Sequence, residues 1–390
     1  MSPRRFTLPA FALCCALAAP ASAAVTKGPA GLKFYAPPAA KVAGKHGSVI
    51  WARSMSGGAV PRSGHSWLVL YRSTAPDGTT VPVSGVVTIP AGKAPKGGWP
   101  VVSWAHGTTG IADSCAPSRL MVKKPTTAYD KNFQAEATHW VQEGFAVAQT
   151  DYQGLGTPGL HSYLIGKAEG RSVIDAVAAT RALDAHVGKR WFTSGHSQGG
   201  HAVLWAAALA HAYAPGLTLT GAAPLAPASH IGEQAAYIKT LDGEPFGGIP
   251  ALIIAAGLDS AGVEPATALS DKAMALYPDI EKVCLDVLGQ QDNWGGLPLK
   301  EIFRDDYDIG PLSALLESND PENLTITVPL LIAQGTKDTT VVPGFTDDTV
   351  KQLRGRGTKI TYKTYDGIDH QGVVEASRKD VDTFLDKRLG

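Results

Sequence analysis

Short apolar runs alternate with longer helical patterns over most of the chain, from Gly85 to Gly335. This alternation is typical of parallel βαβ units rather than of a β-sandwich. The sequence therefore predicts an α/β fold with a mostly parallel central sheet and helices on both faces. The predicted strands cover residues 84–89, 101–105, 145–150, 191–194, 221–224, 328–333 and 359–364.

The alternation stops between residues 231 and 324, a stretch that lies between two predicted core strands. Open α/β sheets place their chemistry at the carboxyl ends of the strands, so an insertion there would shape access to a site. We therefore predict a mainly helical cap over residues 231–324. The core is predicted to comprise residues 24–230 and 325–390, and residues 24–63 are expected to be an N-terminal extension wrapped on it.

The N-terminus has the pattern of a secretory signal peptide. Arg4 and Arg5 precede the apolar run 11–19, and the small residues 21–23 offer a cleavage site. The alternative is a membrane anchor, but the run is shorter than the roughly 20 residues that a spanning helix needs. We predict that residues 1–23 are removed and that the mature protein is secreted or periplasmic, with no stable membrane anchor.

Removal of the signal peptide would leave two of the four cysteines, Cys115 and Cys284. An exported protein meets an oxidising compartment, which favours a disulfide between them. A bond across so long a loop would stabilise the fold by restricting the unfolded chain. The alternative is two buried thiols that do not meet.

The composition argues against several classes of function. Hydrophobic residues make up 44% and charged residues 18% of the 390 residues, as expected for a globular chain with a large core. Lys plus Arg and Asp plus Glu number 35 each, so no net charge favours nucleic acid or an anionic membrane. The sequence has no CxxC or HExxH pattern for zinc, and we interpret none of its glycine-rich runs as a nucleotide site. We expect no metal and no cofactor.

Residues 195–199 form the pattern GxSxG, with Ser197 at its centre. The pattern follows a predicted strand and precedes a helical stretch, as in a nucleophile elbow, where a sharp turn lifts the serine hydroxyl out of the sheet. Glycines on either side make room for the neighbouring strand and helix. Ser66 also follows a Gly-His pair, but neither a small residue nor a helix follows, so we interpret Ser66 as a loop or strand residue.

A serine hydroxyl becomes a strong nucleophile when a histidine removes its proton and a carboxylate orients that histidine. Where a nucleophile elbow carries the serine, the acid comes next along the chain and the histidine last. Asp338 and His370 follow the last two predicted strands in that order, so we predict them as acid and base. Asp259, after a strand-like run, is the alternative acid, and Asp366 and Asp369 are interpreted as turn residues. Structural roles are expected for the remaining histidines considered: His106, His161, His201, His211 and His230.

Residues 104–110, WAHGTTG, end a predicted strand with a His-Gly pair typical of an oxyanion hole. Ester cleavage needs donors directed at the negative oxygen of the tetrahedral intermediate. We predict the backbone N–H groups of Gln198 and Thr108 as donors, and Thr109 as a substitute or as a further contact through its hydroxyl. A simple glycine turn is the alternative. Tyr152, after another strand, is predicted to contact the acyl group unless it only closes a turn.

Several longer motifs resemble the secretory lipase family of α/β-hydrolases, which includes the fungal lipase A type. They span most of the mature chain: FYAPP at 34–38, VIWAR at 49–53, LYRST at 70–74, VVSWAHGTTG at 101–110, CAPS at 115–118, GHSQGG at 195–200 and QGTKD at 334–338. The resemblance implies a helical cap between the sixth and seventh strands, lipase or esterase activity and a disulfide involving the cysteine of CAPS. Fungal members carry an acidic oxyanion-hole residue where this chain has HGTTG, so the resemblance leaves the donor pair open.

Together the motifs predict a secreted serine hydrolase that cleaves carboxylic esters, either as a triacylglycerol lipase or as a carboxylesterase, through an acyl-enzyme on Ser197. Its expected partner is a small-molecule or lipid ester, including one at a lipid–water interface, and we expect a monomer. The first alternative is a serine peptidase or amidase, for which the acidic cluster Asp305, Asp306 and Asp308 is the one hint. The second is a non-catalytic binding protein that kept the fold.

Overall fold

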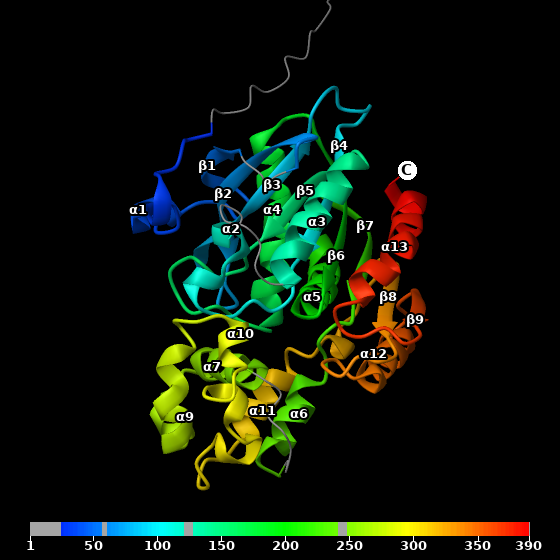
Figure 1. The fold of residues 1–390 in the computed structure, drawn as a ribbon. Helices are drawn as coiled ribbons and strands as arrows, with labels where there is room; N and C mark the ends of the chain where they lie inside the picture. Colours follow the sequence, from blue (N-terminus) through cyan, green and yellow to red (C-terminus); the bar gives the residue numbers. More distant parts are fainter. Residues whose placement is uncertain (1–24, 57–60, 121–127, 241–247, 390) are drawn as a thin grey trace, which may run out of the picture.

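The computed structural model describes residues 25–56, 61–120, 128–240 and 248–389. The predicted signal peptide, residues 1–23, lies outside these residues. The described chain forms one large sheet flanked by helices, with a separate group of helices at one end of the sheet (Figure 1).

The sheet contains nine strands in the described residues, in the order β1-β2-β3-β5-β4-β6-β7-β8-β9. From β5 to β9 neighbouring strands are parallel, whereas β1, β2 and β3 form an antiparallel edge. The strands are β1 Val49–Met55, β2 Gly64–Thr74, β3 Thr80–Pro90, β4 Trp99–Ala105, β5 Ala146–Thr150, β6 Val187–His196, β7 Thr218–Leu225, β8 Leu330–Gly335 and β9 Ile360–Tyr365. The predicted α/β fold and its seven predicted strands are thus confirmed, with shifts at the strand ends.

One local prediction was wrong. Residues 24–63 are not only an extension, because β1 lies within them and pairs with β2 along the edge of the sheet. The strand-like run before Asp259, residues 251–256, is part of helix α7, Ile249–Ala261, as expected for a mainly helical cap; α7 has Pro250 in its first turn and ends at Gly262 in the left-handed conformation. Periodicity alone cannot distinguish a short apolar strand from a buried helix, and here the helix continues well beyond the run.

Helices cover both faces of the sheet. Helices α4 (Gly166–Leu183), α5 (Gln198–Tyr213) and α12 (Pro343–Gly355) pack on one face, and α3 (Ala128–Gln142) and α13 (Val373–Leu389) pack on the other. Strand β6 contributes side chains to both faces of the sheet. Its consecutive residues Trp191 and Phe192 are buried in the apolar clusters on opposite faces. Short helices on the N-terminal half are η1 Gly31–Phe34, α1 Ala39–Val42, η2 Asp113–Cys115 and α2 Pro117–Leu120. No helix in the described ranges is long and apolar enough to cross a bilayer.

The cap is the chain between β7 and β8, and its helices lie together at one end of the sheet (Figure 1). It buries an apolar cluster of its own, which includes Leu252, Leu258 and Trp294 and also takes in Tyr163 and Leu164 from the core. Its elements are α6 Ile231–Tyr237, η3 Ile238–Thr240, α7, α8 Pro265–Ala268, α9 Asp271–Leu276, η4 Tyr277–Asp279, α10 Leu285–Leu288, η5 Trp294–Gly296, η6 Leu299–Glu301, α11 Gly310–Glu317 and η7 Pro321–Asn323.

The two ends of the cap are tied to each other. The carboxylate of Asp320 accepts hydrogen bonds from the N–H groups of Ile231 (2.6 Å) and Gly232 (3.1 Å). Beside it, His230 Nδ1 lies 2.7 Å from Glu322 Oε1. Entry into the cap and exit from it are therefore clamped at one point, next to the carboxyl ends of β7 and β8.

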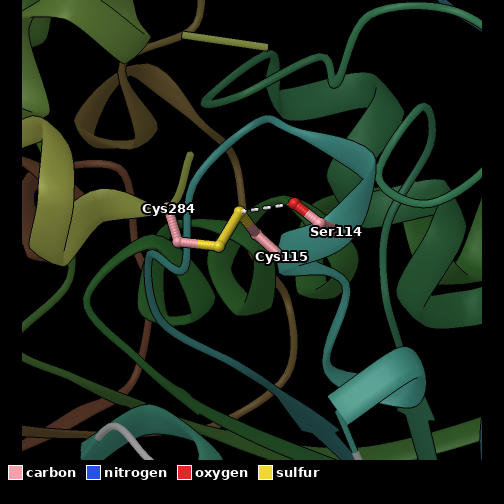
Figure 2. Close-up of a disulfide and its surroundings, with 3 residues drawn as sticks. All are labelled: Ser114, Cys115 and Cys284. Carbon is pink, nitrogen blue, oxygen red and sulfur yellow. Dashed lines mark hydrogen bonds between the residues drawn. A yellow bond between two sulfur atoms is a disulfide. The ribbon is translucent and has the colours of Figure 1, made fainter. Parts of the chain in front are cut away.

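A disulfide joins Cys115 to Cys284 and links the cap to the core (Figure 2). Cys115 ends η2, after β4, and Cys284 immediately precedes α10 in the cap. Their Cα atoms are 5.6 Å apart. The N–H of Leu285 also donates to the carbonyl of Thr109 (3.0 Å), so the cap is bonded to the same loop by its backbone.

Replacing Cys115 and Cys284 together with alanine should lower the free energy of unfolding by about 2–5 kcal/mol. The bond joins residues separated by 169 positions, so its loss releases a long loop in the unfolded chain. Chemical denaturation of the double variant would measure the change. Ser114→Ala, one residue from the bond (Figure 2), is the matched control and should stay close to the parent protein. An unchanged denaturation midpoint in the double variant would contradict the prediction.

Candidate active site

Ser197 occupies the turn between β6 and α5. Its backbone has φ 61° and ψ −117°, a conformation that costs free energy for a residue with a side chain and persists only where the surroundings impose it. The flanking glycines are required by close packing, since a Cβ on Gly195 or Gly199 would lie 2.6 Å or 2.0 Å from the carbonyl oxygen of Ala105. The strand, turn and helix expected around GxSxG are therefore present.

Asp338 and His370 meet in the loops after β8 and β9. His370 Nδ1 donates to Asp338 Oδ2 at 2.7 Å, and both side chains are buried. Oδ1 of Asp338 accepts the N–H groups of Thr340 (2.9 Å) and Val341 (2.8 Å). Burial acts to raise the pKa of Asp338, but His370 and these N–H groups outweigh it and hold that pKa below its ordinary value. The carboxylate is thus ionised and keeps the proton of His370 on Nδ1.

His370 also lies against the nucleophile turn. The ring of His196, the residue before Ser197, packs against the ring of His370 with centroids 4.4 Å apart. Burial and the nearby His370 hold the pKa of His196 well below its ordinary value, so His196 is neutral. Nε2 of His370 is buried and has no hydrogen-bond partner among the described residues. With its proton on Nδ1, His370 presents a free lone pair on Nε2.

The competing residues lie elsewhere. Asp259 is at the exposed C-terminal end of α7 in the cap. Asp366 accepts a hydrogen bond from the Thr336 hydroxyl (3.2 Å), and Asp369 accepts one from the N–H of Gly372 (2.8 Å), as turn residues do. Ser66 is buried in β2, where it shares a hydrogen bond with Thr88 (2.8 Å).

The loop after β4 lies against the nucleophile turn. Gly199 is packed against the carbonyls of Ala105 and His106, which puts the following Thr108 close to the start of α5. The N–H of Gln198 is in the first turn of that helix, where no intrahelical acceptor exists and the helix dipole favours negative charge. Among the described residues, neither this N–H nor that of Thr108 has an acceptor. Both remain available as oxyanion donors.

Two predicted substrate contacts are placed differently. Tyr152 is fully buried and its hydroxyl donates to the carbonyl of His106 (2.8 Å), so it supports the loop from below and does not line the cavity. Its predicted contact with the acyl group is therefore corrected. Thr109 is also outside the cavity lining, although its hydroxyl is buried without a partner among the described residues.

A cavity of about 600 Å³ opens at Ser197. Most of its wall comes from the cap, where apolar side chains outnumber the polar Glu233 and Gln234. The apolar cap contribution includes Ile253, Ile254, Leu299, Phe303, Leu312 and Leu316. Tyr237 and Val342 also line it and remain 58% and 44% exposed. The sequence marked the cap as a binding element but did not identify these residues, because their role depends on how short helices pack.

The polar residues beneath Ser197 were also missed. The side chain of Gln198 bonds to Glu169 and His161, both fully buried; from the sequence, His161 was assigned only a structural role and Glu169 none. Within the described ranges no three His, Cys, Asp or Glu side chains gather as a metal site would require. Residues 154–159 match a GxGxxG spacing, but α4 begins only at Gly166, so they lack the helix that a nucleotide fingerprint needs.

Comparison with known proteins gives a consistent result. The family "Secretory lipase" matches residues 126–389. A Mycobacterium tuberculosis protein named "Probable inactive lipase" is 29% identical over 238 residues, which are 57% of this chain and 50% of that protein. A secreted triacylglycerol lipase of Malassezia globosa is 31% identical over 191 residues, 47% of this chain and 39% of that protein. The matches thus span half or less of these relatives.

The fold is shared with solved structures. Candida antarctica lipase A in its closed state superimposes with a TM-score of 0.72 at 21% identity, covering 86% of this chain and 80% of that chain. This likeness identifies the fold as that of the α/β-hydrolases.

Proposed function

Since the chain belongs to the secretory lipase family, we propose that it hydrolyses carboxylic esters through an acyl-enzyme formed on Ser197. One observation carries the proposal. Ser197 sits in a nucleophile turn beside the bonded pair His370 and Asp338, at the opening of an apolar cavity. An apolar wall suits an acyl chain, while the polar groups converge at one end where the ester bond would lie.

The first half of the cycle forms the acyl-enzyme. His370 Nε2 takes the proton of the Ser197 hydroxyl as the oxygen attacks the ester carbonyl carbon, and the carbonyl electron pair moves onto oxygen. The N–H groups of Gln198 and Thr108 stabilise that oxyanion. The intermediate then expels the alcohol, which leaves with the proton held by His370.

The second half releases the acid. Water attacks the acyl carbon while His370 Nε2 accepts its proton, and the new tetrahedral intermediate uses the same oxyanion donors. Collapse returns the proton to the Ser197 oxygen and frees the carboxylic acid. Asp338 stays ionised throughout and stabilises the imidazolium that forms twice in each cycle.

The alternatives find less support. The acidic residues proposed for amine recognition lie on the cap surface, where Asp306 pairs with Arg304 and Asp308 accepts the N–H of Gly310. None of these three acidic residues lines the cavity, although another carboxylate of the cap, that of Glu233, does. A protein without activity is suggested by the name of the Mycobacterium tuberculosis relative, but the intact His370–Asp338 pair beside Ser197 supports catalysis here.

We also propose that the protein acts outside the cytosol. A disulfide persists in an oxidising compartment and is rare in reducing ones. The Malassezia globosa relative carries the word secreted in its name, which supports the same location.

Purified protein should hydrolyse p-nitrophenyl butyrate and leave the matching amide, butyryl p-nitroanilide, essentially untouched. Parallel assays on p-nitrophenyl palmitate and emulsified triolein would separate a carboxylesterase from a lipase. Turnover of the anilide at a rate comparable to the ester would favour the amidase instead. Folded protein that cleaves none of these compounds would refute the proposed function.

A further inference from the structure

Glu169 is a buried carboxylate that the proposed mechanism does not use. It lies in the first turn of α4 with no solvent exposure. Its Oε1 accepts the N–H of Leu164 (2.9 Å) and Nε2 of Gln198 (2.8 Å), and its Oε2 accepts Nδ1 of His201 (2.7 Å). Three donors from three different segments therefore converge on one side chain.

The partner His201 carries a positive charge. Its Nδ1 faces a carboxylate oxygen and its Nε2 faces the carbonyl oxygen of Asn319 (2.9 Å), so both ring nitrogens must carry a proton. Burial acts to lower the pKa of His201, but the hydrogen bond and charge of Glu169 outweigh it and raise the pKa. Glu169 and His201 thus form a buried ion pair next to the cap exit.

Gln198 is held by its side chain from two sides. The Nδ1 of His161 faces the carbonyl of Gln153 (2.9 Å) and donates to it, which leaves Nε2 as an acceptor. Burial lowers the pKa of His161, in agreement with a neutral ring. The Gln198 amide donates one hydrogen to His161 Nε2 (2.9 Å) and the other to Glu169, so its orientation is fixed. Its backbone N–H is one of the proposed oxyanion donors.

Glu169 is also linked, through Leu164 and Tyr163, to Thr108, which carries the second proposed donor. Leu164, whose N–H it accepts, has a positive φ of 55°, a strained conformation that this bond helps to hold. The hydroxyl of the preceding residue, Tyr163, shares a 2.7 Å hydrogen bond with the hydroxyl of Thr108. One carboxylate is therefore connected to the residues that carry both N–H groups of the oxyanion hole.

The geometry points to Glu169 as a positioning residue that sets the spacing of the two oxyanion donors from beneath. This inference rests on the proposed ester hydrolysis. Because the donors act on charge that develops only in the transition state, a shift in their spacing lowers kcat far more than it raises KM.

The variant Glu169→Gln tests the inference at nearly constant side-chain volume. Glutamine has one acceptor oxygen, so it cannot accept from Leu164, Gln198 and His201 together, and one of these donors then faces an NH₂ group. We expect kcat on p-nitrophenyl butyrate to fall about 10- to 100-fold with KM within about threefold. The affinity for a butyl trifluoromethyl ketone should fall by the same factor as kcat/KM, because its hemiketal with Ser197 places an oxyanion in the hole.

A matched control lies on the same helix. Asp175 is equally buried in α4 and bonds to His46 (2.7 Å), Ser73 (2.8 Å) and Tyr213 (2.7 Å), away from the catalytic loops. Asp175→Asn should lower the melting temperature and leave kcat and the ketone affinity unchanged. If Glu169→Gln behaves in the same way, Glu169 is only structural and the inference is wrong.

Two further measurements keep the test decisive. If Glu169→Gln does not fold, Gln198→Met removes the side-chain anchor while keeping the backbone N–H, and the same loss of kcat and ketone affinity is expected. If the parent protein binds the ketone at Ser197 but cleaves no ester, the proposed function fails while the ketone affinities of the variants still decide the role of Glu169. A parent protein that does not bind the ketone overturns both.

Discussion

Replacing Ser197 with alanine should lower kcat on p-nitrophenyl esters by about 10⁵- to 10⁶-fold. The proposed cycle has no other group that forms the acyl-enzyme, and the remaining oxyanion donors give only a small residual rate through bound water. The fold should persist, because the Ser197 hydroxyl makes no hydrogen bond to another described residue. The backbone N–H and carbonyl group of residue 197 keep their hydrogen bonds in the variant. Steady-state kinetics and a thermal melt of the same preparation would measure both effects.

Ser66→Ala is the matched control for the nucleophile. Ser66 also follows a Gly-His pair, but it lies inside β2 with its hydroxyl bonded to Thr88. Its loss should reduce stability slightly and leave kcat at the parent value. Substantial ester hydrolysis by Ser197→Ala, with no contaminating esterase, would show that the nucleophile lies elsewhere.

Replacing Asp338 with asparagine should lower kcat by about 10⁴-fold. The asparagine oxygen can still accept the N–H groups of Thr340 and Val341, so its NH₂ group would face Nδ1 of His370. His370 would then carry its proton on Nε2, the nitrogen that must accept the proton of Ser197. The rate loss should therefore appear in kcat at neutral pH, with the fold intact by circular dichroism.

Asp259→Asn and Asp366→Asn are the controls for this assignment. Asp259 lies at the exposed end of α7 and Asp366 bonds only to Thr336 among the described residues, so both variants should keep nearly full activity. A large loss in Asp259→Asn together with normal activity in Asp338→Asn would transfer the role of the acid to the cap.

Local patterns were sufficient to predict the elements that hold the proposed catalytic residues. GxSxG after an apolar strand predicts the strained turn at Ser197, because few other sequences allow so close an approach of strand and helix. Asp338 and His370 were predicted as acid and base because each follows a core strand and parallel strands end at one edge of the sheet. The break in the alternation of strand and helix patterns also predicted the cap insertion between two core strands. That alternation depends only on residues that are neighbours along the chain.

Features that depend on contacts between distant segments could not be predicted. The edge strand β1 is a strand because β2 pairs with it. Tyr152 was placed in the cavity wall from its position after a strand, but the packing of the loop after β4 buries it.

The sequence alone therefore determined the fold class, the order of the proposed catalytic residues and the place of the cap, because those depend on short patterns and on chain order. Only the tertiary structure decided which side chains line the cavity and that Glu169 lies beneath Gln198. Hydrogen bonds between residues 29 and 32 positions apart, as for Glu169 with Gln198 and His201, leave no periodic signal in the sequence. They arise only when α4 and α5 pack side by side on the sheet.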